Sequence, residues 1–275
     1  MEKSIAQYIH HNTKLIINFI ITLILWIYFT LGFVVFFSFF YFAASLFSKN
    51  SEIAFQRLNC KFHRGFFLLT RVLIPMNKWN IYDDVADIKS SIIVCNHISY
   101  LDPLILISLF EKHKTIVKSS LFTIPIFGQI LKLAGYIPST SRGKLSKLMI
   151  RHIEKMDNYL SSGGNFFVFP EGTRSRNGKI GHLNKGVFKI AKQCKSSIKV
   201  LHIQNTDKLF QPGNFLFNTC IPNTVTIELL ATIEPDYQSK SFSISKLMEQ
   251  VKTLLSENKQ PVKRRDGDIP FRQDI

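Results

Sequence analysis

The hydrophobic pattern of the chain changes near residue 76. Before this point apolar residues form one long stretch and a shorter run, and after it short apolar runs alternate with longer segments of helical periodicity. The short runs predict strands at Lys78–Tyr82, Ser91–Cys95, Thr115–Lys118, Gly135–Pro138, Asn165–Phe169, Lys199–Gln204 and Thr224–Ala231. The longer segments predict helices at Pro103–Lys112, Phe127–Ala134, Lys144–Leu160, Lys185–Gln193 and Ser243–Glu257. This alternation indicates a layered α/β domain with a mostly parallel sheet, whose strand ends carry the ligand site.

The N-terminal part of the chain predicts a membrane-embedded helical segment. Leu15–Phe47 contains no charged residue and is dominated by Phe, Ile and Leu. As one helix it is about 50 Å long, against roughly 30 Å of bilayer hydrocarbon. It is too long for a cleavable signal peptide and lacks a clear small-residue cleavage site. Two arrangements fit: one tilted span, or two short helices broken near Thr30–Gly32 that enter one leaflet.

Basic residues around this segment predict its orientation and the domain organisation. Two lysines precede the apolar stretch, and a larger group of basic residues follows it: Lys49, Arg57, Lys61 and Arg64. This excess places the C-terminal domain on the cytoplasmic side of the membrane. The next apolar run, Phe66–Ile74, suits either the membrane interface or a core helix. We therefore expect a membrane anchor over residues 1–50, an α/β domain over 51–257 and a polar basic tail over 258–275.

Composition restricts the partners of the protein. The 275 residues carry a formal net charge of +16, which suits an anionic partner: nucleic acid, an acidic membrane surface or a phosphorylated substrate. The lysines are spread along the chain and no nucleic-acid reader motif is recognisable, so a nucleic-acid partner is not expected. The cysteines lie far apart, which indicates neither a disulfide framework nor a metal site and suits a reducing compartment.

A histidine and an aspartate flank a short polar turn between two apolar runs. His97 follows the predicted strand Ser91–Cys95, and Asp102 precedes Pro103. A carboxylate that accepts a hydrogen bond from one imidazole nitrogen leaves the other nitrogen free to take a proton. The pair resembles a hydrolase triad without its nucleophile, which the substrate then supplies. In the alternative interpretation, Asp102 caps a helix that begins at Pro103, and His97 is an ordinary loop residue.

The remaining histidines and Cys95 have simpler interpretations. Cys95 and His97 share a face if the strand continues, so a Cys–His nucleophilic pair is geometrically conceivable, although a cysteine that ends an apolar strand is usually a small buried side chain. His202, within an apolar strand, is expected in the core or a pocket. The other histidines show no metal-ligand spacing and are expected at the surface: His10, His11, His63, His113, His152 and His182.

A second polar turn follows the predicted strand Asn165–Phe169. Glu171, Gly172, Thr173 and Arg174 come directly after Pro170. Glycine allows the backbone to approach a ligand closely, threonine offers a hydroxyl group, and arginine offers a bidentate fork for phosphate. Taken alone, the segment could equally be an exposed polar hairpin turn.

Together the two turns resemble a known family. Asn96-His97-x-x-x-x-Asp102, followed about seventy residues later by Phe169-Pro170-Glu171-Gly172-Thr173-Arg174-Ser175, is similar to the glycerolipid acyltransferases, whose best-known bacterial members are the 1-acyl-glycerol-3-phosphate acyltransferases. The resemblance covers roughly residues 80 to 235. Further landmarks agree with it: Lys118 with Leu121, Ile124, Pro125, Phe127 and Gly128, and Lys185-Gly186-Val187-Phe188. The chain departs from the family at Ser141, where an aspartate usually precedes the arginine now at Arg142, and at His202, where a proline is usual.

The resemblance implies acyl transfer from acyl-CoA or acyl carrier protein to the free hydroxyl of 1-acyl-glycerol-3-phosphate, which makes phosphatidic acid without a metal or other cofactor. His97 would act as general base and Asp102 would orient it. Arg174, with Lys118 and Arg142, would hold the phosphate, and Glu171, Gly172 and Thr173 would line the acceptor site. The alternatives are a relative acting on another acceptor, such as glycerol-3-phosphate or a lyso-aminolipid, and a membrane-bound hydrolase that uses the same pair on water.

Overall fold

A seven-stranded sheet forms the centre of the domain in the computed structural model, which describes residues 2–140, 143, 145–175 and 180–257. The strands are β1 (Asn77–Ile81), β2 (Ile92–Cys95), β3 (His113–Val117), β4 (Ile137–Pro138), β5 (Asn165–Val168), β6 (Ile198–Gln204) and β7 (Asn223–Ile233). Their order is β1-β7-β6-β2-β5-β3-β4. All neighbours are parallel except β6 and β7, so the predicted mostly parallel sheet is confirmed.

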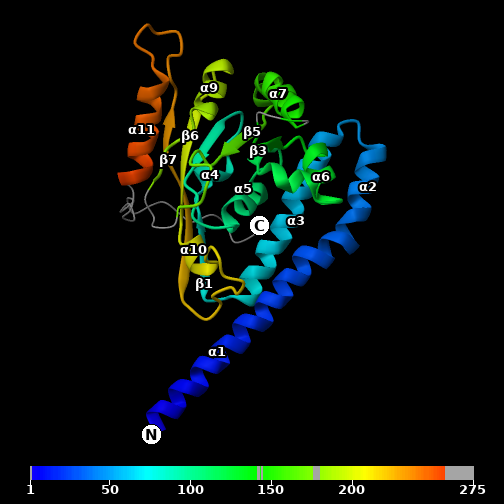
Figure 1. The fold of residues 1–275 in the computed structure, drawn as a ribbon, viewed down its shortest axis with the longest axis vertical. Helices are drawn as coiled ribbons and strands as arrows, with labels where there is room; N and C mark the ends of the chain where they lie inside the picture. The colour runs from blue at the N-terminus through cyan, green and yellow to red at the C-terminus, as the bar shows by residue number, and fades with distance from the viewer. Residues whose placement is uncertain (1, 141–142, 144, 176–179, 258–275) are drawn as a thin grey trace.

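Alternating side chains of the central strands fill two cores, one on each face of the sheet. In β2, Ile93 and Cys95 belong to one core, and Ile92 and Val94 belong to the other. The first core is covered by α3 (Ser51–Leu73) and α5 (Leu101–Leu109). The second is covered by α8 (Met156–Ser161), α9 (Lys185–Gln193) and α11 (Ile244–Glu257), as Figure 1 shows for α9 and α11. Strands covered on both faces explain the uninterrupted apolar runs in the sequence.

Each predicted strand exists, with shifted ends, but one predicted helix is wrong. The segment Lys144–Leu160 contains two helices, α7 (Ser146–Glu154) and α8, separated at Lys155, whose φ of −92° and ψ of 3° leave the helical region. The other predicted helices correspond to α5, α6 (Phe127–Leu133), α9 and α11. Short helical turns also occur at Asp83–Ala86 (α4), Ser119–Thr123 (η2) and Thr206–Leu209 (α10).

The N-terminal apolar stretch is a continuous helical run. It consists of α1 (Glu2–Ile27), a π-helical segment η1 (Tyr28–Phe37) and α2 (Ser38–Phe47). Thr30–Gly32, the point of the break in the two-helix arrangement, lies within η1, so the chain stays helical there. Residues 7–47 form one helix long and apolar enough, by length and composition, to cross a membrane. Figure 1 shows α1 extending away from the sheet, with the N-terminus at its far end.

Helix α3 returns alongside this run and joins it to the domain. It contacts α1, η1 and α2 on one side and α5 on the other. The sequence pattern predicted only its C-terminal end, because its buried face includes the polar residues Gln56, Asn59 and His63. These side chains are hydrogen-bonded: Gln56 to the carbonyl of Ala134 at 2.9 Å, and Asn59 to the hydroxyl of Tyr136 at 3.0 Å. Buried polar residues with partners remove the hydrophobic periodicity that would otherwise have predicted the helix.

The sheet topology brings the two polar turns together. Since β2, β3, β5 and β6 are parallel, their carboxyl ends lie along one edge of the sheet. The turn with His97 follows β2, the turn with Glu171 follows the adjacent β5, and Lys118 follows β3. This edge is where parallel α/β sheets bind ligands.

Candidate active site

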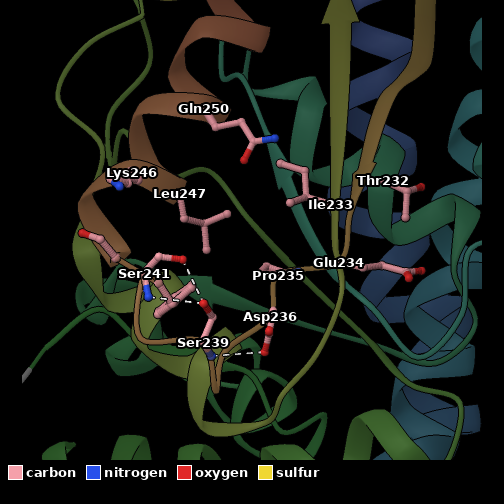
Figure 2. A pocket seen from close by; sticks show the side chains of 12 residues that line it. Thr232, Ile233, Glu234, Pro235, Asp236, Ser239, Ser241, Lys246, Leu247 and Gln250 are labelled. Carbon is pink, nitrogen blue, oxygen red and sulfur yellow. Dashed lines mark hydrogen bonds between the residues drawn. The ribbon is translucent and has the colours of Figure 1, made fainter.

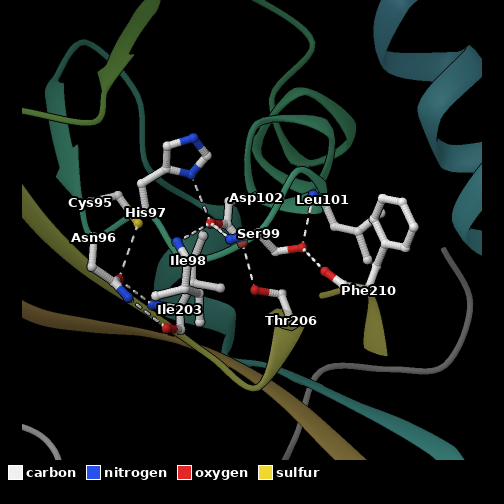
Figure 3. Close-up of polar contacts among 10 residues, drawn as sticks. All are labelled: Cys95, Asn96, His97, Ile98, Ser99, Leu101, Asp102, Ile203, Thr206 and Phe210. Atoms are coloured by element: carbon white, nitrogen blue, oxygen red, sulfur yellow. Dashed lines mark hydrogen bonds and ion pairs between the residues drawn. The ribbon is translucent and has the colours of Figure 1, made fainter. Parts of the chain in front are cut away.

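His97 and Asp102 are hydrogen-bonded to each other at the carboxyl edge of the sheet. His97 Nδ1 lies 2.9 Å from Asp102 Oδ2 (Figure 3). When Nδ1 carries the proton and donates it to the carboxylate, Nε2 holds the lone pair. The imidazole is stacked on Phe169 at a centroid distance of 4.3 Å, and its side chain keeps 17% of its surface exposed. This arrangement is suited to a general base, because a carboxylate orients the imidazole and part of the ring stays accessible.

Asp102 is fully buried, and donors surround its carboxylate. Oδ2 also accepts hydrogen bonds from the backbone N–H groups of Ile98 at 2.7 Å and Ser99 at 2.8 Å. Oδ1 accepts one of 2.6 Å from the hydroxyl of Thr206, which begins α10. A buried carboxylate is costly unless it is hydrogen-bonded, and these donors meet that cost.

The helix-cap interpretation of Asp102 is wrong. Helix α5 begins at Leu101, and its N-cap residue, Tyr100, makes no capping bond with its side chain. The Asp102 carboxylate accepts hydrogen bonds from backbone N–H groups that precede the helix. The first N–H group of the helix, that of Leu101, donates a hydrogen bond of 3.3 Å to the hydroxyl oxygen of Ser99 instead. Asp102 therefore stabilises the turn and the imidazole, not the helix terminus.

The turn is fixed to neighbouring elements on both sides. The Asn96 amide bonds both backbone groups of Ile203 on β6: it donates to the carbonyl at 2.8 Å and accepts from the N–H at 2.7 Å. The Ser99 hydroxyl donates to the carbonyl of Phe210 at 2.8 Å. These bonds, drawn in Figure 3, hold the catalytic candidates on a rigid support.

The second polar turn lies directly beside the first. The N–H of Ser175 donates to the carbonyl of His97 at 2.8 Å, which fixes the two turns in register. Gly172 adopts a φ of +68°, a conformation that favours glycine, and Thr173 is exposed. The guanidinium carbon of Arg174 lies 3.3 Å from the ring centroid of Tyr100.

Two charged groups of this turn have unused hydrogen-bonding atoms. Glu171 accepts a 2.9 Å bond from the N–H of Gly181 through Oε2, but its buried Oε1 has no partner among the described residues. The buried Nη1 of Arg174 also has none within that part of the chain. A buried donor and a buried acceptor without partners, next to His97, are suited to binding a polar ligand.

The structure places the other two basic candidates differently. Lys118 is exposed and follows β3 on the same sheet edge, two strands from β2. Arg142 lies outside the described residues, as do Ser141 and the expected tail over 258–275.

Cys95 has the environment of a core residue. It is fully buried, and its Sγ lies 3.7 Å from Asn96 Oδ1. Burial, aided by the charges of Asp102 and Glu171, raises the pKa of its thiol well above the usual value. A buried thiol that resists ionisation is a poor nucleophile.

The expectation that the unassigned histidines lie at the surface is wrong for His63, His113 and His152, which are buried. The ring of His113 contacts the carbonyl of Phe110 and the hydroxyl of Tyr136, each at 2.5 Å. Burial lowers the pKa of His113 to about 3 and those of His63 and His152 to about 4.

His202 is buried on β6, as expected for a core residue. Its Nδ1 lies 3.5 Å from the carboxylate of Glu228 and 3.1 Å from the amide of Gln204. Glu228 is the partner of His202 across the antiparallel β6–β7 pair.

A pocket of about 500 Å³ lies elsewhere in the molecule (Figure 2). It is formed where β7 ends and α11 begins, and Ile233 in its wall pairs with Ile198 at the start of β6. The start of β6 is at the opposite edge of the sheet from His97, so this pocket is separate from the candidate active site.

Thr206 is a residue of this site that the sequence did not indicate. It lies 104 positions after Asp102, in a short helical turn beyond β6. No local motif marks it, because its role depends on the β2–β6 pairing that brings the two segments together.

The fold and the paired turns define a parallel-sheet α/β domain with a His–Asp site at its carboxyl edge. Residues 78–204 match the family model described as Acyltransferase. The crystal structure of the 1-acyl-sn-glycerophosphate acyltransferase of Thermotoga maritima has the same fold: the TM-score is 0.66 at 22% identity, covering 90% of this chain and 98% of that one.

Relatives in sequence carry related names. A chloroplastic 1-acyl-sn-glycerol-3-phosphate acyltransferase of Arabidopsis thaliana is 31% identical over 52% of this chain and 40% of its own length. A protein of that name from Borreliella burgdorferi is 28% identical over 56% of this chain and 64% of its own. The matched part of this chain therefore spans only about half the length of these relatives.

Proposed function

We propose that the protein transfers an acyl group from a thioester, acyl-CoA or acyl carrier protein, to the free hydroxyl of 1-acyl-glycerol-3-phosphate and so forms phosphatidic acid. One observation carries the proposal: a His–Asp pair lies beside an arginine turn, and the Ser175–His97 backbone bond joins the two. The names of the relatives support this choice of acceptor.

In the proposed reaction His97 Nε2 takes the proton of the acceptor hydroxyl. The oxygen attacks the thioester carbonyl carbon and a tetrahedral intermediate forms. Its collapse breaks the C–S bond, and the imidazolium returns the proton to the leaving thiolate. Asp102 holds the imidazole in position and balances the charge that it gains. A positioned general base supplies about 10²–10⁴-fold in rate.

The arginine turn supplies the acceptor site. The guanidinium of Arg174 binds the phosphate, assisted by Lys118 and Arg142, since guanidinium groups match phosphate oxygens in a bidentate manner. Glu171 lines the glycerol side of the acceptor site, and its buried Oε1 has no partner among the described residues. Gly172 and Thr173 line the acceptor site, and nothing lies within 4 Å of the position that a Cβ on Gly172 would take.

The lipid acceptor is consistent with the N-terminal helix. Residues 7–47 anchor the protein in the membrane, and the basic residues that follow place the catalytic domain on the cytoplasmic side. Residues 1–50 form this anchor, residues 51–257 form the catalytic domain, and 258–275 form a basic tail.

The test uses purified protein with labelled acyl-CoA or acyl carrier protein and a panel of acceptors: lysophosphatidate, glycerol-3-phosphate and a lyso-aminolipid. The expected product, identified by mass, is phosphatidate. Free fatty acid in place of an ester would instead indicate a hydrolase. His97→Ala should abolish transfer while thermal unfolding stays near wild type, and retained transfer would refute the role of His97.

A further inference from the structure

Tyr100 lies inside the His97–Asp102 turn but takes no part in proton transfer. It precedes α5, its side chain is half exposed, and its ring contacts Phe210 at a centroid distance of 6.0 Å. Its exposed surface leaves the ring available to a partner side chain from a neighbouring segment.

That partner is Arg174 from the other turn. The guanidinium carbon lies 3.3 Å from the Tyr100 ring centroid, so the planar cation covers the face of the ring. Arginine is suited to this geometry, because its flat face stacks on an aromatic ring while its N–H groups project from the edges. In this position Nη1 has no partner among the described residues.

We propose that Tyr100 is the positioning residue for the phosphate-binding guanidinium of Arg174. The ring fixes the plane of the cation before the acceptor arrives, which leaves its edge free for two parallel bonds to phosphate oxygens. A long arginine side chain otherwise loses rotamer freedom on binding, and the ring reduces that cost in advance. The inference rests on the proposed function, since it assigns Arg174 to the acceptor phosphate.

The same contact connects the turn that carries the proposed base with the turn that holds the acceptor phosphate. Tyr100 belongs to the turn that carries the base, and Arg174 belongs to the turn that holds the phosphate. Stacking sets the position of the phosphate relative to His97, and the Ser175–His97 bond fixes the backbones of the same two turns. The acceptor hydroxyl is thereby placed at a defined distance from the base.

The test compares Tyr100→Leu, which removes the aromatic face, with Tyr100→Phe, which keeps it. Tyr100→Leu should raise the KM for lysophosphatidate about threefold to tenfold, with little change in kcat or in the KM for the acyl donor. Tyr100→Phe should restore the acceptor KM. Tyr237→Leu serves as the matched control, because this ring packs on Phe242 near the distant pocket and should leave both KM values unchanged.

A double-mutant cycle separates stacking from a general structural effect. In an Arg174→Gln background, Tyr100→Leu should cause no further rise in acceptor KM, and with monoacylglycerol, which lacks the phosphate, it should have no effect in the wild-type background. Additive effects, equal losses for donor and acceptor, or failure of Tyr100→Phe to restore the KM would overturn the inference.

Equilibrium binding of lysophosphatidate in detergent gives the same comparison without turnover. If wild-type protein transfers no acyl group to any acceptor, yet binds lysophosphatidate less well after Tyr100→Leu, the proposed function fails and the role of Tyr100 stands. If transfer proceeds normally and neither binding nor KM responds to Tyr100→Leu, the inference fails and the proposed function stands.

Discussion

The hydroxyl of Thr206 donates a 2.6 Å hydrogen bond to Oδ1 of Asp102, although 104 residues separate the two. Both side chains are fully buried. The remaining oxygen, Oδ2, faces His97 and two backbone N–H groups, so Thr206 is the donor that occupies the far side of the carboxylate. This bond fixes the rotation of the carboxylate and hence the direction in which the imidazole is held.

Replacing Thr206 should therefore weaken the proposed catalysis without removing a reacting group. Thr206→Val keeps the volume but removes the donor, and a hydrogen bond to a charged group contributes about 1.5–3 kcal/mol. We expect kcat to fall about tenfold or more with both KM values nearly unchanged. Thr206→Ser, which keeps the hydroxyl, should recover most of the rate. Equal activity in the valine and serine variants would contradict this role.

Asp102→Asn tests the charge of the carboxylate separately from its geometry. The amide oxygen can replace Oδ2 as acceptor from His97, Ile98 and Ser99, and the amide NH₂ can donate to Thr206. The turn should keep its shape, but the imidazolium loses its counter-charge. We expect kcat to fall about 10²–10⁴-fold with a melting temperature near that of wild type. A variant with wild-type kcat would exclude Asp102 from the mechanism.

Cys95 distinguishes direct transfer from an acyl-enzyme route. The buried thiol, whose pKa is raised by burial, should take no part in the reaction. Cys95→Ala should keep near-wild-type kcat and lose about 1 kcal/mol of stability from the removed sulfur atom. Intact mass spectrometry of wild-type protein mixed with acyl-CoA should detect no acyl adduct. An adduct that disappears in Cys95→Ala would establish the covalent route.

The buried histidines predict that stability is lost in mild acid. His113 has a pKa of about 3 in the folded protein, against an ordinary value of 6.5. The unfolded chain therefore binds more protons than the folded one below pH 6.5, and this one residue lowers the unfolding free energy by about 1.4 kcal/mol per pH unit from pH 6 toward pH 3.

Thermal unfolding in detergent between pH 7 and pH 4 measures this loss. His113→Gln should reduce the dependence of stability on pH, even though it removes hydrogen bonds and destabilises the protein at pH 7. His182→Gln is the control, since this exposed residue should leave the dependence unchanged. A wild-type stability that stays constant down to pH 4 would contradict the prediction.

Much of the fold follows from the sequence because its signals are local. The apolar runs at Ile92–Cys95 and Asn165–Val168 are buried on both faces, and such runs are read directly as strands. The N-terminal part of helix α3 carries no such signal, because Gln56 and Asn59 are buried with partners that lie far away in the chain. The surface prediction for His113 failed for the same reason, since its partner Tyr136 reaches it only through the packed fold.

The sequence by itself determined the short-range part of the site. His97 and Asp102 are five residues apart on one turn, so local backbone geometry is enough to bring them together, and the glycine and arginine of the second turn are likewise contiguous. Only the tertiary structure decided the rest: the β2–β6 pairing brings Thr206 to Asp102, and the β2–β5 pairing brings Arg174 onto Tyr100. The physical reason is that strand order and register depend on the packing of the whole sheet, which no single segment encodes.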